Sequence, residues 1–133
     1  MPTLAIQLDS PIPITEQIVA GLRRAIAMGH LQPNDELPPV RQLAADLGVN
    51  LNTVARAYRA LEASGLVSTV RGRGTCVTSS TEKRSAGRST STSQIKQRMT
   101  DAVVDARLAG FTQNEMTKVF QDVLTTFFKT TST

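Results

Sequence analysis

The strongest constraint on the fold is a pair of short helical patterns that only two residues, Gly48 and Val49, separate. Apolar residues recur at helical spacing in residues 40–47, before Gly48, and in residues 54–61, after Val49. Ala44 and Gly48 are small, which lets two helices approach closely, and the glycine also permits a tight turn. The spacing therefore predicts a helix-turn-helix.

The segments on either side complete a mainly helical unit with a small β-hairpin. Residues 14–26 carry a longer apolar stripe at helical spacing, and residues 4–8 alternate in a way that suits a short strand or an extended arm. Two β-favouring runs flank the glycine-containing turn of residues 71–74. A helix-turn-helix followed by such a hairpin is a winged helix-turn-helix, which we expect to span residues 1–78.

Positive charge is concentrated in the middle of the sequence. The chain has 15 Lys and Arg against 11 Asp and Glu, a formal net charge of +4 at pH 7. Between residues 38 and 98, ten basic residues stand against three acidic ones, whereas both ends of the chain are slightly acidic. We therefore expect an anionic partner, and double-stranded DNA in particular, to contact the middle of the chain.

The second helix of the pair has an outward face suited to DNA. Its Asn52, Thr53 and Arg56 combine an amide, which suits adenine, with a guanidinium, which suits guanine or phosphate. Arg71 and Arg73, beside flexible glycines in the hairpin turn, suit phosphates or a narrow minor groove. An isolated polar helix face is more often only solvated, but the hairpin and the basic middle favour a DNA interface here.

Three motifs carry a resemblance to a known family. They are L-P-x-x-R-x-L-A at the first helix of the pair, G-V-x-x-N-T-V-x-R-A-Y at the second, and R-G-x-G-T in the hairpin. Through them, residues 11–78 resemble the DNA-binding domain of GntR-type bacterial transcription regulators. The resemblance implies that Gly72 lets the hairpin turn enter the minor groove. It also implies that five residues of the two helices touch DNA: Arg41, Asn50, Asn52, Thr53 and Arg56.

Three positions depart from the family's common pattern. Pro39 stands where a serine commonly caps the helix, so one capping hydrogen bond and one phosphate contact should be missing. Asn34 replaces a common glycine, which is tolerable because asparagine accepts left-handed backbone geometry. Leu51 replaces a common proline or arginine, so the family's base preference does not carry over at this position.

Beyond the hairpin the composition changes twice. In residues 78–93, ten of sixteen are Ser or Thr, and we expect a linker over residues 79–93 because little there can be buried. Residues 94–133 carry two helical stripes, the second opened by a capping box at Thr112 and Glu115. Four of the five aromatic residues lie in this tail.

The tail needs another surface to cover its apolar stripes. About forty residues in two helices are too few to enclose a core of their own. A second copy of the chain is the simplest partner, which predicts a C-terminal dimerisation tail and a homodimer. An unidentified small-molecule effector in a pocket lined by the phenylalanines is the alternative, which we rank below the interface. The residues expected in the interface are Met99, Val103, Met116, Phe120, Val123 and Phe127.

Several classes of protein are excluded. We find no paired acid and base, no nucleophile constellation and no phosphate-binding loop, so we expect no enzyme. One His and one Cys leave too few ligands for a zinc site, and we expect neither metal nor cofactor. Cys76 suits a small apolar strand residue better than a redox sensor. Without a signal peptide or a run of about 18 apolar residues, we expect a cytoplasmic protein that makes no membrane contact.

The expected function is sequence-specific transcription regulation. The short tail is similar to that of the YtrA-type subfamily, whose members are dimers and often sit with transporter operons. This resemblance implies a homodimeric repressor on an inverted-repeat operator, with a transporter operon as one target. The alternative is an architectural DNA-binding protein with little sequence choice.

Overall fold

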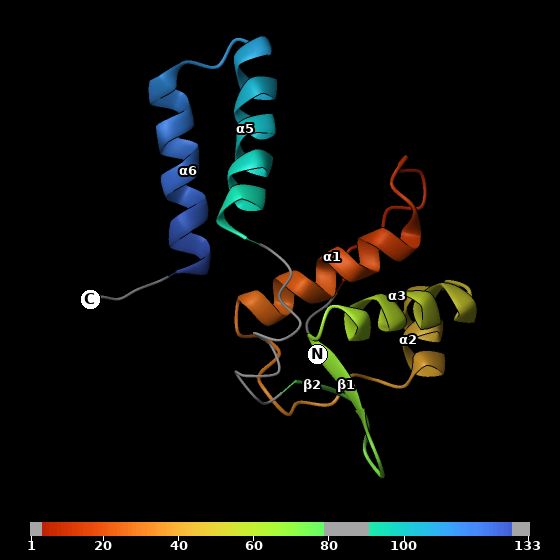
Figure 1. The fold of residues 1–133 in the computed structure, drawn as a ribbon. Helices are drawn as coiled ribbons and strands as arrows, with labels where there is room; N and C mark the ends of the chain where they lie inside the picture. The colour runs from red at the N-terminus through yellow and green to blue at the C-terminus, as the bar shows by residue number, and fades with distance from the viewer. Residues whose placement is uncertain (1–3, 79–90, 129–133) are drawn as a thin grey trace. The chain divides into compact units, whose positions relative to one another are not determined.

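The structure, a computed structural model, describes residues 4–78 and 91–128. The chain falls into two compact units, an N-terminal unit up to Arg88 and a C-terminal unit from Ser89. The described residues form helices and one antiparallel hairpin, which confirms the expected fold class (Figure 1). In chain order the elements are α1 (Ile14–Ala27), α2 (Val40–Leu47), α3 (Leu51–Ala63), β1 (Val67–Val70), β2 (Gly74–Val77), α5 (Thr92–Leu108) and α6 (Gln113–Phe127).

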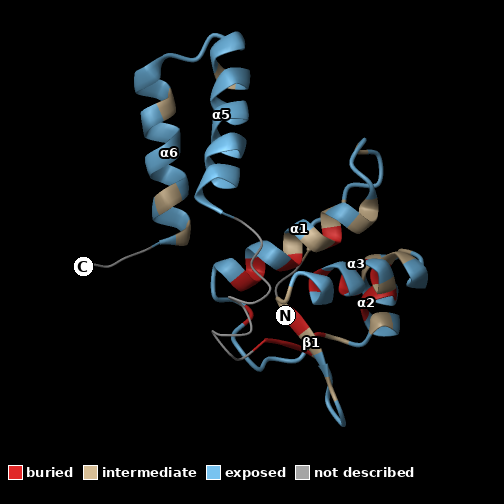
Figure 2. Ribbon diagram, viewed as in Figure 1, coloured by how far each residue is buried: buried red, intermediate tan, exposed pale blue. Residues whose placement is uncertain are grey.

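The helix α3 is the centre of the N-terminal unit, since it packs against α1, α2 and β1. Its Val54, Ala57, Tyr58 and Leu61, which the sequence predicts as the inward stripe, are all buried. Figure 2 shows further buried residues on α1, α2 and β1, and these form one core with α3. Each large aliphatic side chain buried in this core contributes about 1.5–3 kcal/mol, so the apolar stripes hold the three helices together.

The turn between α2 and α3 is short and fixed by its caps. The helix α2 ends at Gly48, whose φ of 69° lies in the left-handed region that glycine tolerates. The N–H of Val49 donates to Ala44 O at 3.0 Å, and Asn50 Oδ1 accepts from Asn52 N–H at 2.7 Å. These bonds confirm the helix-turn-helix and set the direction in which α3 leaves the turn.

A side chain of α3 holds the start of α2 in place. Pro39 is the N-cap, and within the described chain no side chain caps this end, as the missing serine predicts. Instead the Tyr58 hydroxyl donates a 2.6 Å hydrogen bond to Pro38 O. Burial raises the pKa of Tyr58 to about 12, so the phenol keeps the proton that it donates. The sequence pattern identified Tyr58 as core but did not predict this bond.

We call the β1–β2 hairpin with its loop, residues 67–77, the wing. Val70 pairs with Gly74, which leaves the loop Arg71–Arg73 beyond the last pair of the ladder. The N–H of Arg73 donates to Val70 O at 3.0 Å and closes the turn. The predicted hairpin is confirmed, and its loop is the outermost part of the wing (Figure 1).

A third segment, residues 34–37, pairs with the other edge of β2. Glu36 bridges to Cys76, which is buried between the two neighbouring segments. Two further backbone hydrogen bonds of 2.8 Å join the segments: Leu37 N–H to Thr75 O, and Val77 N–H to Asp35 O. The base of the wing is therefore held on both edges of β2, a pairing that the sequence analysis did not foresee.

Residues 4–7 form an arm without regular secondary structure, so the strand predicted as one alternative for residues 4–8 is wrong. The Gln17 side chain takes the place of a partner strand. The N–H of Gln7 donates to Gln17 Oε1 at 2.8 Å, and Gln17 Nε2 donates to Gln7 O at 3.0 Å. Because one amide satisfies these backbone groups, the arm needs no sheet neighbour. Leu4 and Ile6 of the arm pack against the core.

The C-terminal unit consists of α5 and α6, and each helix begins with a capping box. Thr112 and Glu115 form the predicted box at α6. Ser91 and Gln94 form a second box, so α5 starts at Thr92, inside the segment expected to be linker. This cap does not stand out in the sequence, because Ser91 lies among many other Ser and Thr residues. No described residue of either helix is buried (Figure 2).

Two expectations fall on parts of the chain that the structure does not describe. The rest of the expected linker, residues 79–90, and the end of the expected dimerisation tail, residues 129–133, lie outside the described residues. Within residues 4–78 and 91–128, no helix is both long and apolar enough to cross a membrane.

Candidate nucleic-acid interface

One side of α3 presents the predicted DNA-reading residues. Asn52 and Arg56 are exposed and Thr53 is half-buried. Asn52 and Arg56 are four positions apart, so their side chains are neighbours on the helix surface. Leu51, the first residue of α3, is 38% exposed and lies beside them in the sequence. The structure therefore brings an amide, a guanidinium and an apolar side chain to the N-terminal half of one helix.

Asn50 has a structural task in addition to its predicted contact with DNA. Its Oδ1 accepts the hydrogen bond from Asn52 N–H and so satisfies one of the free amide groups at the start of α3. The amide nitrogen of Asn50 takes no part in this cap. The Nδ2 of Asn50 therefore stays available for a contact with a nucleic acid.

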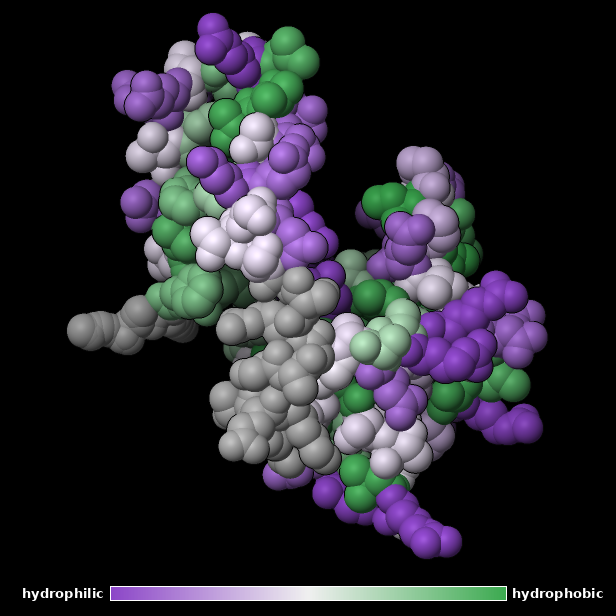
Figure 3. All heavy atoms as spheres, viewed as in Figure 1, coloured by the Kyte–Doolittle hydropathy of each residue, from purple (hydrophilic) through white to green (hydrophobic). Residues whose placement is uncertain are grey.

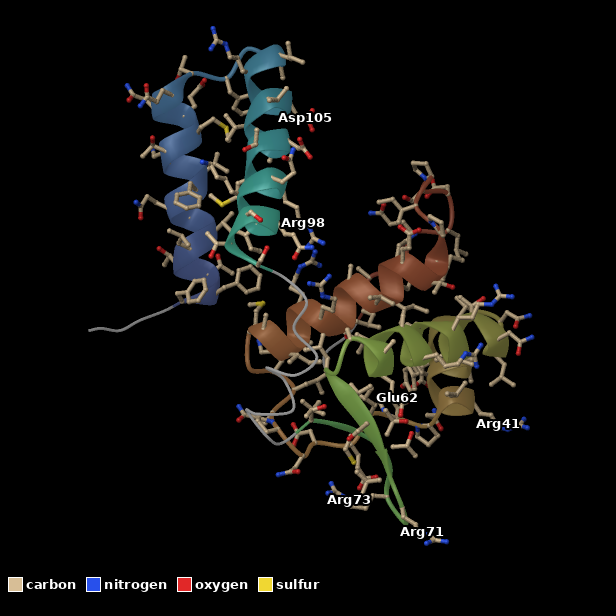
Figure 4. The ribbon with its side chains drawn as sticks, viewed as in Figure 1. Arg41, Glu62, Arg71, Arg73, Arg98 and Asp105 are labelled. Carbon is tan, nitrogen blue, oxygen red and sulfur yellow. The ribbon has the colours of Figure 1, made fainter. Side chains whose placement is uncertain are left out.

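Arg41 extends the candidate interface onto α2. It is the second residue of that helix and is exposed. Figure 4 shows its side chain directed outward from α2. The free N–H groups of the first helical turn give this end of α2 a partial positive charge, which adds to the charge of the guanidinium.

The wing places Arg71 at its tip. The side chain is exposed, and Figure 4 shows it at the end of the hairpin. Gly72 has a φ of 83°, and a Cβ added there would meet no atom within 4 Å. The turn therefore requires glycine for its backbone conformation and not for space, which suits a tip that projects into its surroundings.

Arg73, which the sequence analysis grouped with Arg71, is engaged within the protein. Its Nη2 donates to Asn34 O at 2.6 Å, and its Nε lies 3.6 Å from Glu36 Oε1. The side chains of Arg73 and Glu36 are 45% and 54% exposed, so the ion pair is open to solvent. The two wing arginines thus have different surroundings, although both stand beside the same glycine.

Most of the residues predicted for the dimer interface line one hollow of the C-terminal unit. A hollow of about 860 Å³ runs along α5 and α6, and five of the six predicted residues line it: Met99, Val103, Met116, Phe120 and Val123. The sixth, Phe127, is half-buried and does not line the hollow. Figure 3 shows apolar side chains at the surface of both helices. Leu108, which the prediction omitted, is 83% exposed.

The described residues offer little for other chemistry. Nowhere in residues 4–78 or 91–128 do three His, Cys, Asp or Glu side chains cluster as metal ligands would.

The contacts of Arg73 with Asn34 and Glu36 were not predicted from the sequence, since 39 positions separate Asn34 from Arg73. The Tyr58 bond was foreseeable in kind, because a buried phenol usually needs an acceptor.

A short turn that directs an exposed polar helix, together with an arginine-tipped hairpin, defines a winged helix-turn-helix DNA-binding protein. The family described as "Bacterial regulatory proteins, gntR family" matches residues 14–77, which cover α1 to β2. The chain belongs to the GntR family.

The similarity to individual proteins extends beyond the DNA-binding domain. The HTH-type transcriptional repressor YtrA of Bacillus subtilis is 38% identical over 108 residues, which are 79% of this chain and 81% of that protein. The crystal structure of a transcriptional antiterminator from Listeria monocytogenes superposes with a TM-score of 0.77 at 27% identity, covering 92% and 90% of the two chains. YtrA from Sulfolobus acidocaldarius has a TM-score of 0.57 at 33% identity, covering 80% of this chain and 98% of that one.

These relatives settle the broad class of function. The chain is a DNA-binding transcription regulator, and the family to which it belongs consists of regulators and not of enzymes. The expectations of a GntR-type fold, of DNA as partner and of no enzymatic activity are thereby confirmed.

Proposed function

We propose that the chain is a homodimeric repressor that binds an inverted-repeat operator. Residues 1–78 form the DNA-binding domain, residues 79–93 link it to the tail, and residues 94–133 make the dimer. The observation that carries the proposal is the apolar surface of α5 and α6, in which no described residue is buried. The name of the Bacillus relative, a transcriptional repressor, supports the sign of regulation.

The DNA contacts follow from the exposed residues of the N-terminal unit. The N-terminal half of α3 enters the major groove, where Asn52 and Arg56 read base edges and Thr53 and Asn50 support them. Arg41 on α2 binds a phosphate beside the groove. The wing tip, with Arg71 and Gly72, lies against the neighbouring minor groove or its phosphates.

The dimer follows from the apolar surface of the tail. Met99, Val103, Phe120 and Val123 are 44–51% exposed, although they line one hollow. Such a surface costs free energy in water, at about 25 cal/mol for each Å² that remains uncovered. Two helices from each of two copies would form a four-helix bundle, a common way to bury such stripes. A stable interface of this kind buries at least about 1,200 Å² in total.

The symmetry of the dimer sets the form of the operator. A twofold axis relates the two copies of α3, so the operator should be an inverted repeat. Its half-sites should lie about 34 Å apart, one turn of DNA, or a small multiple of that distance. A transporter operon is the target that the family resemblance suggests. We place the regulator in the cytoplasm, where it meets its operator.

The experiment compares two variants that add the same charge to α6. Val123→Glu places a carboxylate in the hollow, whereas Gln121→Glu places one on an exposed residue outside its lining. Sedimentation should give a dimer for the unchanged chain and for Gln121→Glu, and a monomer for Val123→Glu. The monomer should bind a half-site and lose affinity for the full operator. A dimeric Val123→Glu variant would disprove the proposed interface.

A second measurement tests sequence choice. Affinity is compared at fixed salt between duplexes selected by the full chain and random duplexes. We expect at least about a thousandfold preference for the selected duplexes. Equal affinity for both would assign the chain to architectural DNA binding instead.

A further inference from the structure

We propose that Arg73 is a positioning residue that fixes the wing, and that Arg71 is the wing arginine that reaches DNA. The assignment rests on the proposed function, since it concerns how the wing approaches the duplex. It also revises the expectation that both arginines bind phosphate or enter the minor groove.

Two contacts hold the Arg73 guanidinium in the structure. Nη2 donates a 2.6 Å hydrogen bond to Asn34 O, and Nε lies 3.6 Å from the Glu36 carboxylate. Together they engage two nitrogens of one planar group, so they fix its orientation as well as its position. A phosphate contact by Arg73 would have to use the N–H groups that these two contacts leave unengaged.

The partners of Arg73 belong to the rigid part of the sheet. Asn34 has a φ of 74°, and its N–H donates to Val77 O at 3.0 Å. Glu36 forms the backbone bridge to Cys76 on the same edge of β2. Because backbone hydrogen bonds hold this edge, a side chain bound to it is anchored to the core of the N-terminal unit.

Without the side-chain contacts of Arg73, the backbone bond from Arg73 N–H to Val70 O would be left to hold the loop. It lies beyond the last pair of the ladder, Val70 with Gly74. Gly72 and Gly74, the neighbours of Arg73 on both sides, have φ values of 83° and 89°. Glycine crosses between backbone conformations readily, and a two-stranded hairpin alone is only marginally stable. The Arg73 contacts therefore determine where the tip, and with it Arg71, is held.

A double-mutant cycle on DNA binding separates positioning from direct contact. The full chain and its variants are measured on one duplex selected from random sequence. If Arg73 acts through Arg71, Arg73→Ala should weaken binding about tenfold in the unchanged chain but less than about twofold in an Arg71→Ala background. Equal factors in the two backgrounds would mean independent contacts and overturn the assignment.

Two further variants give results that depend on the role of Arg73. Arg73→Lys keeps the charge but cannot reproduce the planar contacts, so binding should remain weakened; full recovery would indicate a phosphate contact. Glu36→Gln should weaken binding relative to Glu16→Gln, which removes the same charge from the exposed start of α1. Tighter binding by Glu36→Gln than by the control would mean that Glu36 withholds Arg73 from DNA, and would overturn the assignment.

The outcomes keep this assignment distinct from the proposed function. If the full chain prefers no duplex, the proposed function fails. If the chain selects duplexes but the cycle is additive, only the role of Arg73 fails. Thermal unfolding of each variant shows whether the fold persists, and a loss of binding accompanied by unfolding at the assay temperature would count against a positioning role.

Discussion

The N-terminal and C-terminal units both contain helices with apolar stripes, but they differ in what those helices bury. The helices α1, α2 and α3 bury their apolar stripes in one core. The helices α5 and α6 begin with complete capping boxes and yet bury no described residue. The difference shows that local sequence signals determine where a helix forms. Burial of its apolar stripe depends instead on another surface against which the helix can pack.

The largest expected effect tests whether the N-terminal unit carries its own stability. Leu22→Ala removes a side chain with no exposed surface and should lower the free energy of unfolding by about 3 kcal/mol. Phe120→Ala is the counterpart in the C-terminal unit, and its cost should depend on protein concentration because it acts through the dimer. Urea unfolding at two concentrations measures both. A concentration-independent loss for Phe120→Ala as large as that for Leu22→Ala would erase the contrast between the units.

The next effect concerns residues of the N-terminal unit that face outward. Arg56→Ala and Arg41→Ala should each weaken DNA binding by about 1–3 kcal/mol and leave thermal stability nearly unchanged, since both side chains are exposed. Arg24→Ala, also exposed but on α1, serves as the control and should affect binding much less. Affinity at fixed salt and thermal unfolding are the two measurements. A matching loss of stability would show that these arginines support the fold.

A smaller effect separates the two tasks of Asn50. Asn50→Ala should lose about 1 kcal/mol of stability because the cap of α3 is gone. Asn50→Asp replaces the amide oxygen of the cap with a carboxylate oxygen and should therefore unfold like the unchanged chain. Both variants lack the amide nitrogen and should bind DNA less tightly. Wild-type DNA affinity for Asn50→Asp would mean that this amide makes no contact.

The smallest effect concerns Tyr58. The chain has one Tyr and no Trp, so phenolate absorbance reports this residue alone. Its midpoint should lie near pH 12 in the folded chain and near pH ~10 in urea. Because folding raises the pKa, the protonated phenol stabilises the fold below pH ~10, and this contribution declines as the pH rises towards 12.

Removal of the hydroxyl provides the matched variant. Tyr58→Phe should cost about 0.5–1 kcal/mol at neutral pH, since Pro38 O loses its donor. The pH dependence of unfolding between 10 and 12 should be weaker in this variant. A folded midpoint near pH 10 in the unchanged chain would show that the phenol is open to water.

The parts of the fold that sequence predicts well are those with local causes. The bounds of α2 and α3 follow from the apolar stripes, the Asn50 cap and Gly48, all within a few positions of one another. The pairing of residues 34–37 with β2 has no local pattern, because its partners are about forty positions apart in the chain. For the same reason the Arg73 contacts could not be predicted, although both arginines were recognised as candidates.

The candidate site divides in the same way. Helical geometry was enough to place Asn52 and Arg56 together on the outward side of α3. The use of Asn50 Oδ1 in a cap was expected from its position, but the separate surroundings of Arg71 and Arg73 required the folded sheet. Charge alone does not distinguish an arginine that is free from one that is bound within the protein.

Because Cys76 is buried, its reactivity can be used to measure how often the strands of the wing separate. It is the only cysteine of the chain and lies in β2, with β1 on one side and residues 34–37 on the other. A thiol in this place meets a thiol-specific reagent only when the strands separate, so its rate of modification measures the frequency of local opening. Bound DNA that holds the wing closed would slow this reaction, and the slowing could be followed by the mass that the reagent adds to the chain.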